Sequence, residues 1–274
     1  MAGFKTRALS AVVLVAVLGS ALFCGSYYLW ALMLFSSLVG FFEFLRAMRD
    51  PAERESMKPD ILEALGYAGI AASYLVFIIW DPIKDLVYVF YVLVVLLIAL
   101  MICYVLQFPQ FPTSKMMQVF FGVIYVGIML SFVYLTRMSE QGLKLVWLIF
   151  IASWICDTCA YLSGMVLGKH KLTPQLSPKK SVEGAIGGVI GAALVGLLYG
   201  IIIKLGDAAW VPGVICGIGA VISQFGDLTA SAIKRNHDIK DYGTLIPGHG
   251  GILDRFDSVI ITAPIVYILS QVFL

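Results

Sequence analysis

The amino-acid sequence predicts an all-α integral membrane protein with about nine transmembrane helices. Of its 274 residues, 60% are hydrophobic and 13% are charged, whereas soluble domains are usually about 45–50% apolar and about 25% charged. The excess apolar residues form runs of about 18–22, the length that a helix needs to cross a bilayer. The clearest run is VYVFYVLVVLLIALMICYVL, at residues 87–106.

Nine apolar spans follow one another along the chain. Lys5 and Arg7 precede the first of them, as they would in a signal peptide. A second apolar run follows directly, however, so we expect the first run to be retained as a transmembrane helix. The first and last spans are the shortest. The expected helices cover residues 8–24, 27–45, 61–80, 86–106, 117–136, 145–165, 184–203, 210–230 and 258–273.

Lysine and arginine indicate the orientation, because the cytoplasmic loops of membrane proteins carry an excess of both. With the N-terminus in the cytoplasm, 15 of the 19 lysines and arginines fall in cytoplasmic segments and 4 fall outside. Nine helices then place the C-terminus outside. We therefore expect a multi-pass protein of the cell (inner) membrane, with its active site and the polar segments 46–60, 169–183 and 231–257 facing the cytoplasm.

The unusual residues lie in the C-terminal half. Residues 1–140 are predicted to be a scaffold of transmembrane helices. Residues 141–274 are predicted to be the catalytic region, with cytoplasmic loops at 169–183 and 231–257. The net charge is only +2 and the basic residues lie in short loops, so no nucleic-acid partner is expected. The five cysteines lie in or beside apolar runs, which argues against a disulfide framework.

Five carboxylates are predicted to meet at the cytoplasmic ends of the last four helices. A charged side chain at membrane depth costs about 2.5–3.5 kcal/mol on insertion scales, and it is usually kept for an ion, a partner or a transport pathway. Clustered carboxylates without His or Cys ligands suit Mg²⁺ or a similar cation. For any one of them alone, an ordinary salt bridge is the alternative. The five residues are Asp157, Glu183, Asp227, Asp254 and Asp257.

Basic residues and glycines are interspersed with these carboxylates. Glycines let the backbone approach a ligand closely, and together with basic side chains they make a phosphate site. A basic loop alone is more often a topology signal or a lipid-headgroup contact. Ser181 is alternatively a helix N-cap, and His249 either binds phosphate, donates a proton or orders its loop. The residues are Lys169, Lys171, Lys179, Lys180, Lys234, Arg235, Lys240 and Arg255, with Gly243, Gly248, Gly250 and Gly251.

Residues 231–257 have the sequence SAIKRNHDIKDYGTLIPGHGGILDRFD. This segment resembles the signature of the phosphatidate cytidylyltransferase family, S-x-I-K-R, K-D, I-P-x-H-G-G and D-R-x-D, at every position. Upstream, DTCAYLSGMVLGKHKL, LSPKKSVEGAIGG and QFGDL are also similar to family segments. The resemblance covers residues 145–274. The N-terminal half resembles the family only in having apolar helices of membrane-spanning length.

The resemblance implies a nucleotidyltransferase of phospholipid biosynthesis that converts CTP and phosphatidate into CDP-diacylglycerol and diphosphate. It implies Mg²⁺, with a second monovalent or divalent cation as an open alternative. The residues expected in catalysis are Asp227, Asp254, Asp257, Lys234, Arg235, His249 and Arg255. Those expected to bind substrate are Ser177, Lys179, Lys180, Ser181, Glu183, Ser231, Lys240, Asp241, Gly250 and Gly251. The expected metal ligands are Asp227, Asp254, Asp257 and Asp157.

Two other functions are alternatives. A CTP-dependent membrane lipid kinase would need similar metal and phosphate contacts. A cation-coupled transporter would also use intramembrane aspartates and helices broken by glycine, but it has no use for the H-G-G-x-x-D-R-x-D loop. A homodimer is implied by the resemblance, and the glycine-lined faces of the seventh and eighth helices point the same way, since small residues allow close helix contact.

Overall fold

The computed structural model describes residues 2–49, 54, 58–248 and 250–274, most of which are helical. The chain forms two compact units. Unit 1 consists of Met1–Met138 and Asp241–Asp254, and unit 2 consists of Ser139–Lys240 and Arg255–Leu274. The polar segment 231–257 is therefore divided between them.

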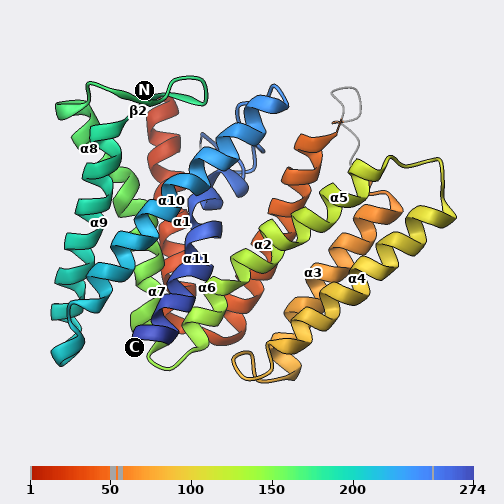
Figure 1. The fold of residues 1–274 in the computed structure, drawn as a ribbon, viewed down its shortest axis with the longest axis horizontal. Coiled ribbons are helices and arrows are strands. Elements are labelled where there is room, and N and C mark those ends of the chain that lie inside the picture. The colour runs from red at the N-terminus through yellow and green to blue at the C-terminus, as the bar shows by residue number, and fades with distance from the viewer. Residues whose placement is uncertain (1, 50–53, 55–57, 249) are drawn as a thin grey trace. The chain divides into compact units, whose positions relative to one another are not determined.

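Unit 1 is a helical bundle in which α2 is the central helix (Figure 1). It packs against α1, α3, α5, η1 and α6, and the last three of these form one continuous helix with a π-helical turn in its middle. The core of unit 1 contains large aromatic side chains such as Phe41, Phe44 and Tyr74, which are 0–2% exposed. The elements are α1 (Ala2–Cys24), α2 (Ser26–Met48), α3 (Ile61–Ile79), α4 (Val87–Leu106), α5 (Thr113–Gly122), η1 (Val123–Ile128) and α6 (Met129–Met138).

An ion-pair network joins three helices of unit 1. Arg49 Nη2 lies 2.5 Å from Glu63 Oε2, while Lys115 Nζ lies 2.5 Å from Glu63 Oε1 and 2.9 Å from Asp60 Oδ2. Asp60 also caps α3, since its carboxylate accepts a hydrogen bond from the Glu63 N–H at 3.0 Å. The Glu63 side chain is 1% exposed, and two cations offset the cost of burying its charge.

Unit 2 is organised by α9, which packs against both α8 and α10 (Figure 1). Glycines make these contacts close. A Cβ at Gly188 would lie 2.9 Å from the Cys156 carbonyl oxygen of α8, and one at Gly196 would lie 2.8 Å from Cys216 Sγ of α10. The elements are α7 (Gly142–Phe150), η2 (Ile151–Ile155), α8 (Cys156–Leu167), β1 (Lys171–Thr173), β2 (Ser177–Ser181), α9 (Val182–Ile202), η3 (Gly206–Ala208), α10 (Val211–Asn236) and α11 (Leu253–Phe273, whose first two residues belong to unit 1).

A short antiparallel hairpin lies within the segment 169–183, which was expected to be a loop. Lys171 pairs with Ser181 and Thr173 pairs with Ser177. At the end of β2, the Ser181 Oγ accepts a hydrogen bond from the Gly184 N–H at 3.1 Å. Ser181 is therefore the N-cap of α9, and the hairpin holds β2 at the start of that helix.

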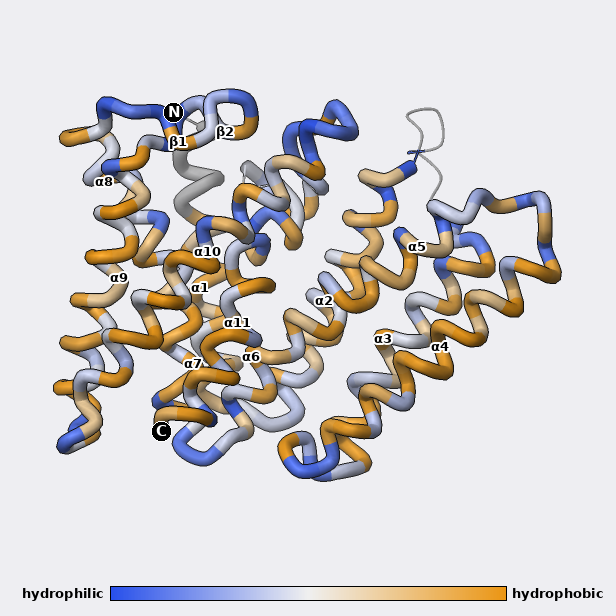
Figure 2. The backbone as a smooth tube through the Cα atoms, in the orientation of Figure 1, coloured by the Kyte–Doolittle hydropathy of each residue, from blue (hydrophilic) through white to orange (hydrophobic). Residues whose placement is uncertain are grey.

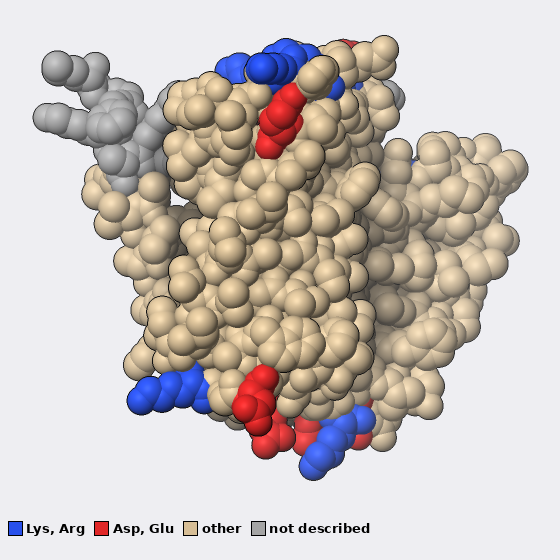
Figure 3. All heavy atoms as spheres, turned by 60° about the vertical axis from the view of Figure 1, so that its left-hand side comes forward, with Lys and Arg blue, Asp and Glu red and all other residues tan. Residues whose placement is uncertain are grey.

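Within the described part of the chain, eight helices are long and apolar enough to cross a membrane, and a shorter apolar helix covers Leu9–Cys24. Apolar residues follow the helices, and hydrophilic residues concentrate in the loops between them (Figure 2). On the face in Figure 3, charged side chains gather at two opposite ends with a largely uncharged band between them. The predicted all-α, multi-pass membrane fold is confirmed, while the sidedness of the termini stays a prediction.

Candidate active site

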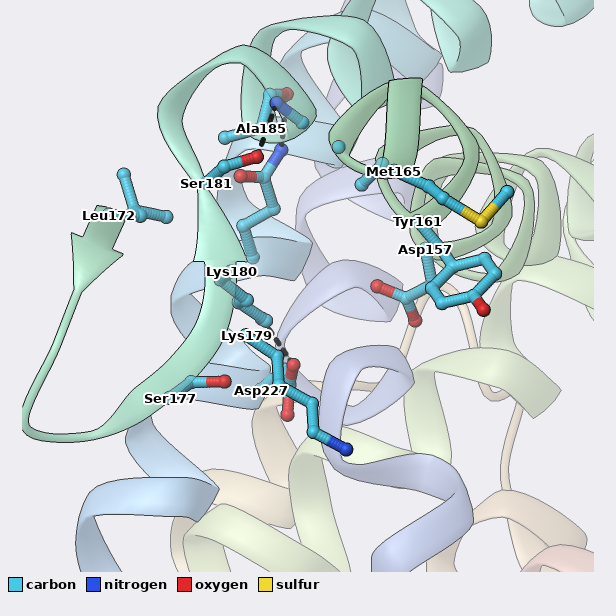
Figure 4. A pocket seen from close by; sticks show the side chains of 14 residues that line it. Asp157, Tyr161, Met165, Leu172, Ser177, Lys179, Lys180, Ser181, Ala185 and Asp227 are labelled. Atoms are coloured by element: carbon cyan, nitrogen blue, oxygen red, sulfur yellow. Dashed lines mark hydrogen bonds and ion pairs between the residues drawn. The ribbon is translucent and has the colours of Figure 1, made fainter. Parts of the chain in front are cut away.

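Unit 2 contains a cavity of about 480 Å³ between α8, β2, α9 and α10 (Figure 4). Apolar and aromatic side chains of α8, among them Tyr161 and Met165, form one wall. The opposite wall is polar and comes from the hairpin and α10. The polar lining consists of Asp157, Ser177, Lys179, Lys180, Ser181, Gln224 and Asp227. Six of these seven residues were predicted site residues, and the cavity brings them together.

The Lys180 ammonium forms an ion pair with the Asp227 carboxylate, drawn as a dashed line in Figure 4. The pair joins β2 to α10, and both side chains are a little over one-quarter exposed. One turn further along α10, the Ser231 hydroxyl donates a hydrogen bond to Asp227 Oδ1 at 3.5 Å. A cation therefore lies beside a carboxylate in an open cavity.

Asp157 reaches the cavity from the first turn of α8, immediately after the π-helical turn η2. A π-helical turn inside an α-helix is rare and is frequently found at functional sites, because it changes the direction of the side chains that follow. The neighbouring Cys156 is fully buried in a cluster with Ala192 and Ala220. With Cys156 held in this cluster, Asp157 is directed toward the cavity (Figure 4).

Asp257 and Lys234 add a third carboxylate and a further cation to unit 2. Lys234 Nζ lies 4.0 Å from Asp257 Oδ2, and the two side chains are only 12% and 14% exposed. Gly226 lets α10 approach α11, since a Cβ there would lie 3.0 Å from the Asp257 carbonyl oxygen. The carboxylate of Asp227 repels those of both Asp157 and Asp257. Like charges are thus gathered here, with Lys180 and Lys234 as counterions.

Glu183 has a different setting. Its carboxylate accepts hydrogen bonds from the backbone N–H groups of Lys169 at 3.0 Å and of His170 at 3.2 Å, and it lies 2.6 Å from His170 Nδ1. These contacts order the turn that follows α8. The substrate-binding role expected of Glu183 stays a prediction.

In unit 1, the glycine-rich segment folds around the carboxylate of Asp254. Asp254 Oδ2 accepts hydrogen bonds from the N–H groups of Tyr242 at 2.8 Å, Gly251 at 3.0 Å and Gly243 at 3.4 Å. Gly250 has φ +85°, a conformation that favours glycine, and a Cβ there would lie 2.8 Å from Asp254 Oδ2. Asp254 is 7% exposed and acts as an anchor for the segment.

Glu43 of α2 is a second anchor, which was not predicted from the sequence. Its two oxygens accept hydrogen bonds from the N–H groups of Ile252 at 3.1 Å and Leu253 at 2.8 Å. A Cβ on Gly243 or Gly251 would collide with its carboxylate, which is why both positions need glycine. The available signal was a lone acidic residue in the apolar run LVGFFEFL, where a charge at membrane depth needs a reason.

The two anchors change the interpretation of the glycine-rich segment. Its glycines were expected to let the backbone approach phosphate, but five of the backbone N–H groups of the segment donate to Glu43 and Asp254. Arg46, one turn beyond Glu43, donates a hydrogen bond to the Tyr242 carbonyl oxygen at 2.8 Å. The glycines therefore make room for buried carboxylates, and the phosphate contacts expected of Gly250 and Gly251 stay predictions.

The remaining predicted residues lie at the end of α10, in the segment that follows it, or at the start of α11. Arg235 Nη1 donates to the Ile239 carbonyl oxygen at 3.3 Å, while Lys240 and Asp241 are exposed. Arg255 Nε is buried and has no hydrogen-bond partner within the described part of the chain. His249 lies outside the described residues.

Residues 5–273 match the cytidylyltransferase family. The chain belongs to this family. A phosphatidate cytidylyltransferase of Staphylococcus saprophyticus is 36% identical over 147 residues, which is 54% of this chain and 56% of that protein. Those of Staphylococcus epidermidis and Staphylococcus aureus are 35% and 36% identical over the same length. The matched part of the chain thus spans little more than half the length of these relatives.

The cytidylyltransferase family generally depends on a divalent metal ion. Within the described ranges, no three His, Cys, Asp or Glu side chains are grouped as metal ligands. The donors present are nevertheless of the right chemical type, since Asp157, Asp227 and Asp257 supply hard oxygens that repel one another. The carboxylates of unit 2 therefore fit a divalent cation by their chemistry, and lysines neutralise two of them in this structure.

Proposed function

We propose that this chain is a phosphatidate cytidylyltransferase that uses CTP and phosphatidate to form CDP-diacylglycerol and diphosphate. The observation that carries the proposal is the Lys180–Asp227 pair in an open polar cavity of unit 2, with the Asp157 carboxylate on the opposite wall. The named relatives from three staphylococci support the same activity.

In the proposed reaction, a phosphate oxygen of phosphatidate attacks the α-phosphorus of CTP. A new P–O bond forms, and the bond from the α-phosphorus to the oxygen that bridges it to the β-phosphate breaks, so that diphosphate leaves. The second pKa of a phosphate monoester is about 6, so the lipid phosphate is mostly dianionic at neutral pH and needs no strong general base. The main barrier is the approach of two anions.

Basic side chains of unit 2 lower this barrier. Lys179 and Lys180 line the cavity with Ser177, where they bind phosphate oxygens and stabilise the charge that develops on diphosphate. Arg255 has a buried Nε without a partner among the described residues, so it is a further candidate for a phosphate contact. Lys234 counters the charge of Asp257.

The three carboxylates of unit 2 would hold Mg²⁺, namely those of Asp157, Asp227 and Asp257. The ligand role expected of Asp254, in unit 1, stays a separate prediction. When bound, the cation would offset the negative charge of the phosphates. The carboxylates themselves position Lys180 and Lys234 through the ion pairs described above. We also propose a homodimer in the cell membrane, with the cavity facing the cytoplasm, where CTP is available from water and phosphatidate from the adjoining leaflet.

The decisive experiment measures which phosphate of CTP is transferred to the lipid. Purified full-length protein, Mg²⁺ and phosphatidate in mixed micelles are incubated with CTP labelled at the α- or the γ-phosphate. We expect the α-label in the lipid fraction. Transfer of the γ-label alone would indicate a lipid kinase, and transfer of neither label would overturn the proposal and favour transport. A chelator should stop α-transfer and added Mg²⁺ should restore it, whereas an unchanged rate would overturn the metal assignment.

A further inference from the structure

Beside the polar cavity, unit 2 has an apolar groove of about 390 Å³ along α9 and α10. Its lining is almost entirely hydrocarbon, since Thr173 and Gln224 are the only polar residues among the described residues that line it. The main contributors are Ile186, Val189 and Ile190 from α9, and Val221, Phe225 and Leu228 from α10.

The groove adjoins the polar cavity. Leu172, Ala185 and Gln224 line both hollows, so the two share a wall. Gln224 is fixed at this boundary, because its side-chain amide donates a hydrogen bond to the Ala185 carbonyl oxygen at 3.0 Å. The lining therefore changes at Gln224. On one side it contains charged and polar side chains, among them Lys180, and on the other side it is apolar.

The groove also opens sideways from the protein. Ile186, Ile190 and Phe225 are 56%, 53% and 61% exposed, and they lie on helices of membrane-spanning length. Surfaces of this kind face lipid when a helix crosses a bilayer. One side of the groove is thus accessible from the membrane. Its other side is the wall with Gln224, which it shares with the cavity that contains Lys179 and Lys180.

We propose that this groove holds one acyl chain of the phospholipid substrate while the phosphate of the same molecule lies in the polar cavity beside Lys180. The inference rests on the proposed function and assigns it a lipid subsite. The lipid has an anionic phosphate joined to apolar acyl chains. The phosphate suits the cavity that contains Lys180, and an acyl chain suits the apolar groove beside it. The alternative occupant is any neighbouring lipid of the bilayer, bound without preference.

In this proposal the groove orients the bound lipid and adds little to its binding free energy. Lipid tails in the bilayer are already in an apolar medium, so moving a chain into the groove gains little from the hydrophobic effect. Packing of the chain fixes where the attached phosphate lies, and a misplacement of about 1 Å can cost on the order of 100-fold in rate. Closing the groove is therefore expected to lower turnover of long-chain substrate.

The test compares Val221→Trp with Val214→Trp. Val221 lines the groove, whereas Val214 lies seven residues earlier on α10, is similarly exposed (39% against 43%) and is not part of the lining. Both variants are assayed with dioleoyl and with dihexanoyl phosphatidate. For Val221→Trp, the ratio of kcat/KM for the long chain to that for the short chain should fall on the order of tenfold. The ratio for Val214→Trp should equal that of the unmodified protein.

An equal effect on both substrates, or the same ratio in both variants, would overturn the groove assignment while leaving the cytidylyltransferase activity intact. Failure of the unmodified protein to form CDP-lipid would instead overturn the proposed function. A second measurement needs no variant. Phosphatidate with a photoreactive group on its acyl chain should label residues 186–190 and 221–228, and unlabelled phosphatidate should compete more strongly than phosphatidylcholine. Uniform labelling of the lipid-facing helices would mean that the groove has no preference.

Discussion

The carboxylate of Glu43 accepts a hydrogen bond of 2.8 Å from the backbone N–H of Leu253, a residue 210 positions later in the chain. Leu253 is the first residue of α11, where N–H groups lack partners within the helix. A negative charge is favourable at this end of a helix. Glu43 thereby connects α2 to the segment that carries Asp254.

Replacing Glu43 with Gln should loosen this segment. The neutral amide presents an NH₂ group toward one of the two backbone donors and loses a charge-assisted contact, so we expect a loss of about 2 kcal/mol in the free energy of unfolding. Amide hydrogen exchange at Ile252 and Leu253 should accelerate. Glu140→Gln, at an exposed position, serves as the control and should change neither quantity. Unchanged exchange at both amides in Glu43→Gln would contradict the anchoring role.

Gly251→Ala tests the same anchor from the other side. Its Cβ would collide with the Glu43 carboxylate, so the side chain or the segment must move. We expect a lower midpoint of thermal unfolding and a loss of activity on the order of tenfold or more, since the reacting groups are displaced. Gly19→Ala is the matched control, because nothing lies within 4 Å of a Cβ there and alanine is the better helix residue. Normal activity in Gly251→Ala would show that the close approach is dispensable.

The positions of the membrane helices could be predicted from the sequence, because apolar length alone determines which segments can span a bilayer. Three helices nevertheless extend well beyond their predicted bounds, since α1 begins at Ala2 and not at residue 8, α10 ends at Asn236 and not at residue 230, and the last helix begins earlier than expected. It was expected at 258–273 but begins at Leu253, since its first turn contains Asp254 and Arg255 and therefore has no apolar signal. The Glu43 contacts that accompany this turn come from the other half of the sequence.

Parts of the candidate site could also be predicted. The carboxylates of unit 2 were identified from their type and from the helix ends on which they were expected, and its lysines from the basic segments between the helices and from the family resemblance. The π-helical turn before Asp157 was missed, because such a turn has no characteristic composition. The hairpin that carries Lys180 was missed as well, since its strands are short and lack an alternating apolar pattern. Glu43 was missed because a single sequence does not show which distant segment a residue contacts.

Gly188→Ala should disturb the contact between α8 and α9. The added Cβ would lie 2.9 Å from the Cys156 carbonyl oxygen and from Ala160 Cβ, and overpacking of this kind typically costs about 1–3 kcal/mol. Because Asp157 follows Cys156 directly, we expect the KM for CTP to rise as well. Gly217→Ala, where the nearest atom would be at an ordinary 3.4 Å, should be neutral or stabilising. Thermal unfolding in detergent and steady-state kinetics measure both effects, and equal stability of the two variants would contradict the packing argument.

The Lys180–Asp227 pair can be tested by a double-mutant cycle. Lys180→Met and Asp227→Asn each leave one charge without its partner, so each should lower stability by about 1–3 kcal/mol, whereas the double variant should recover part of that loss. Activity should behave differently, because both groups are proposed to contact the reacting phosphates or their cation. Each single variant should lose on the order of 100-fold in kcat. The double variant should lose at least as much. Lys144→Met, an exposed lysine of the same unit, should leave both quantities unchanged. A double variant that regains activity together with stability would mean that the pair only holds β2 against α10, and the chemistry would then have to be assigned to the other basic residues of the cavity.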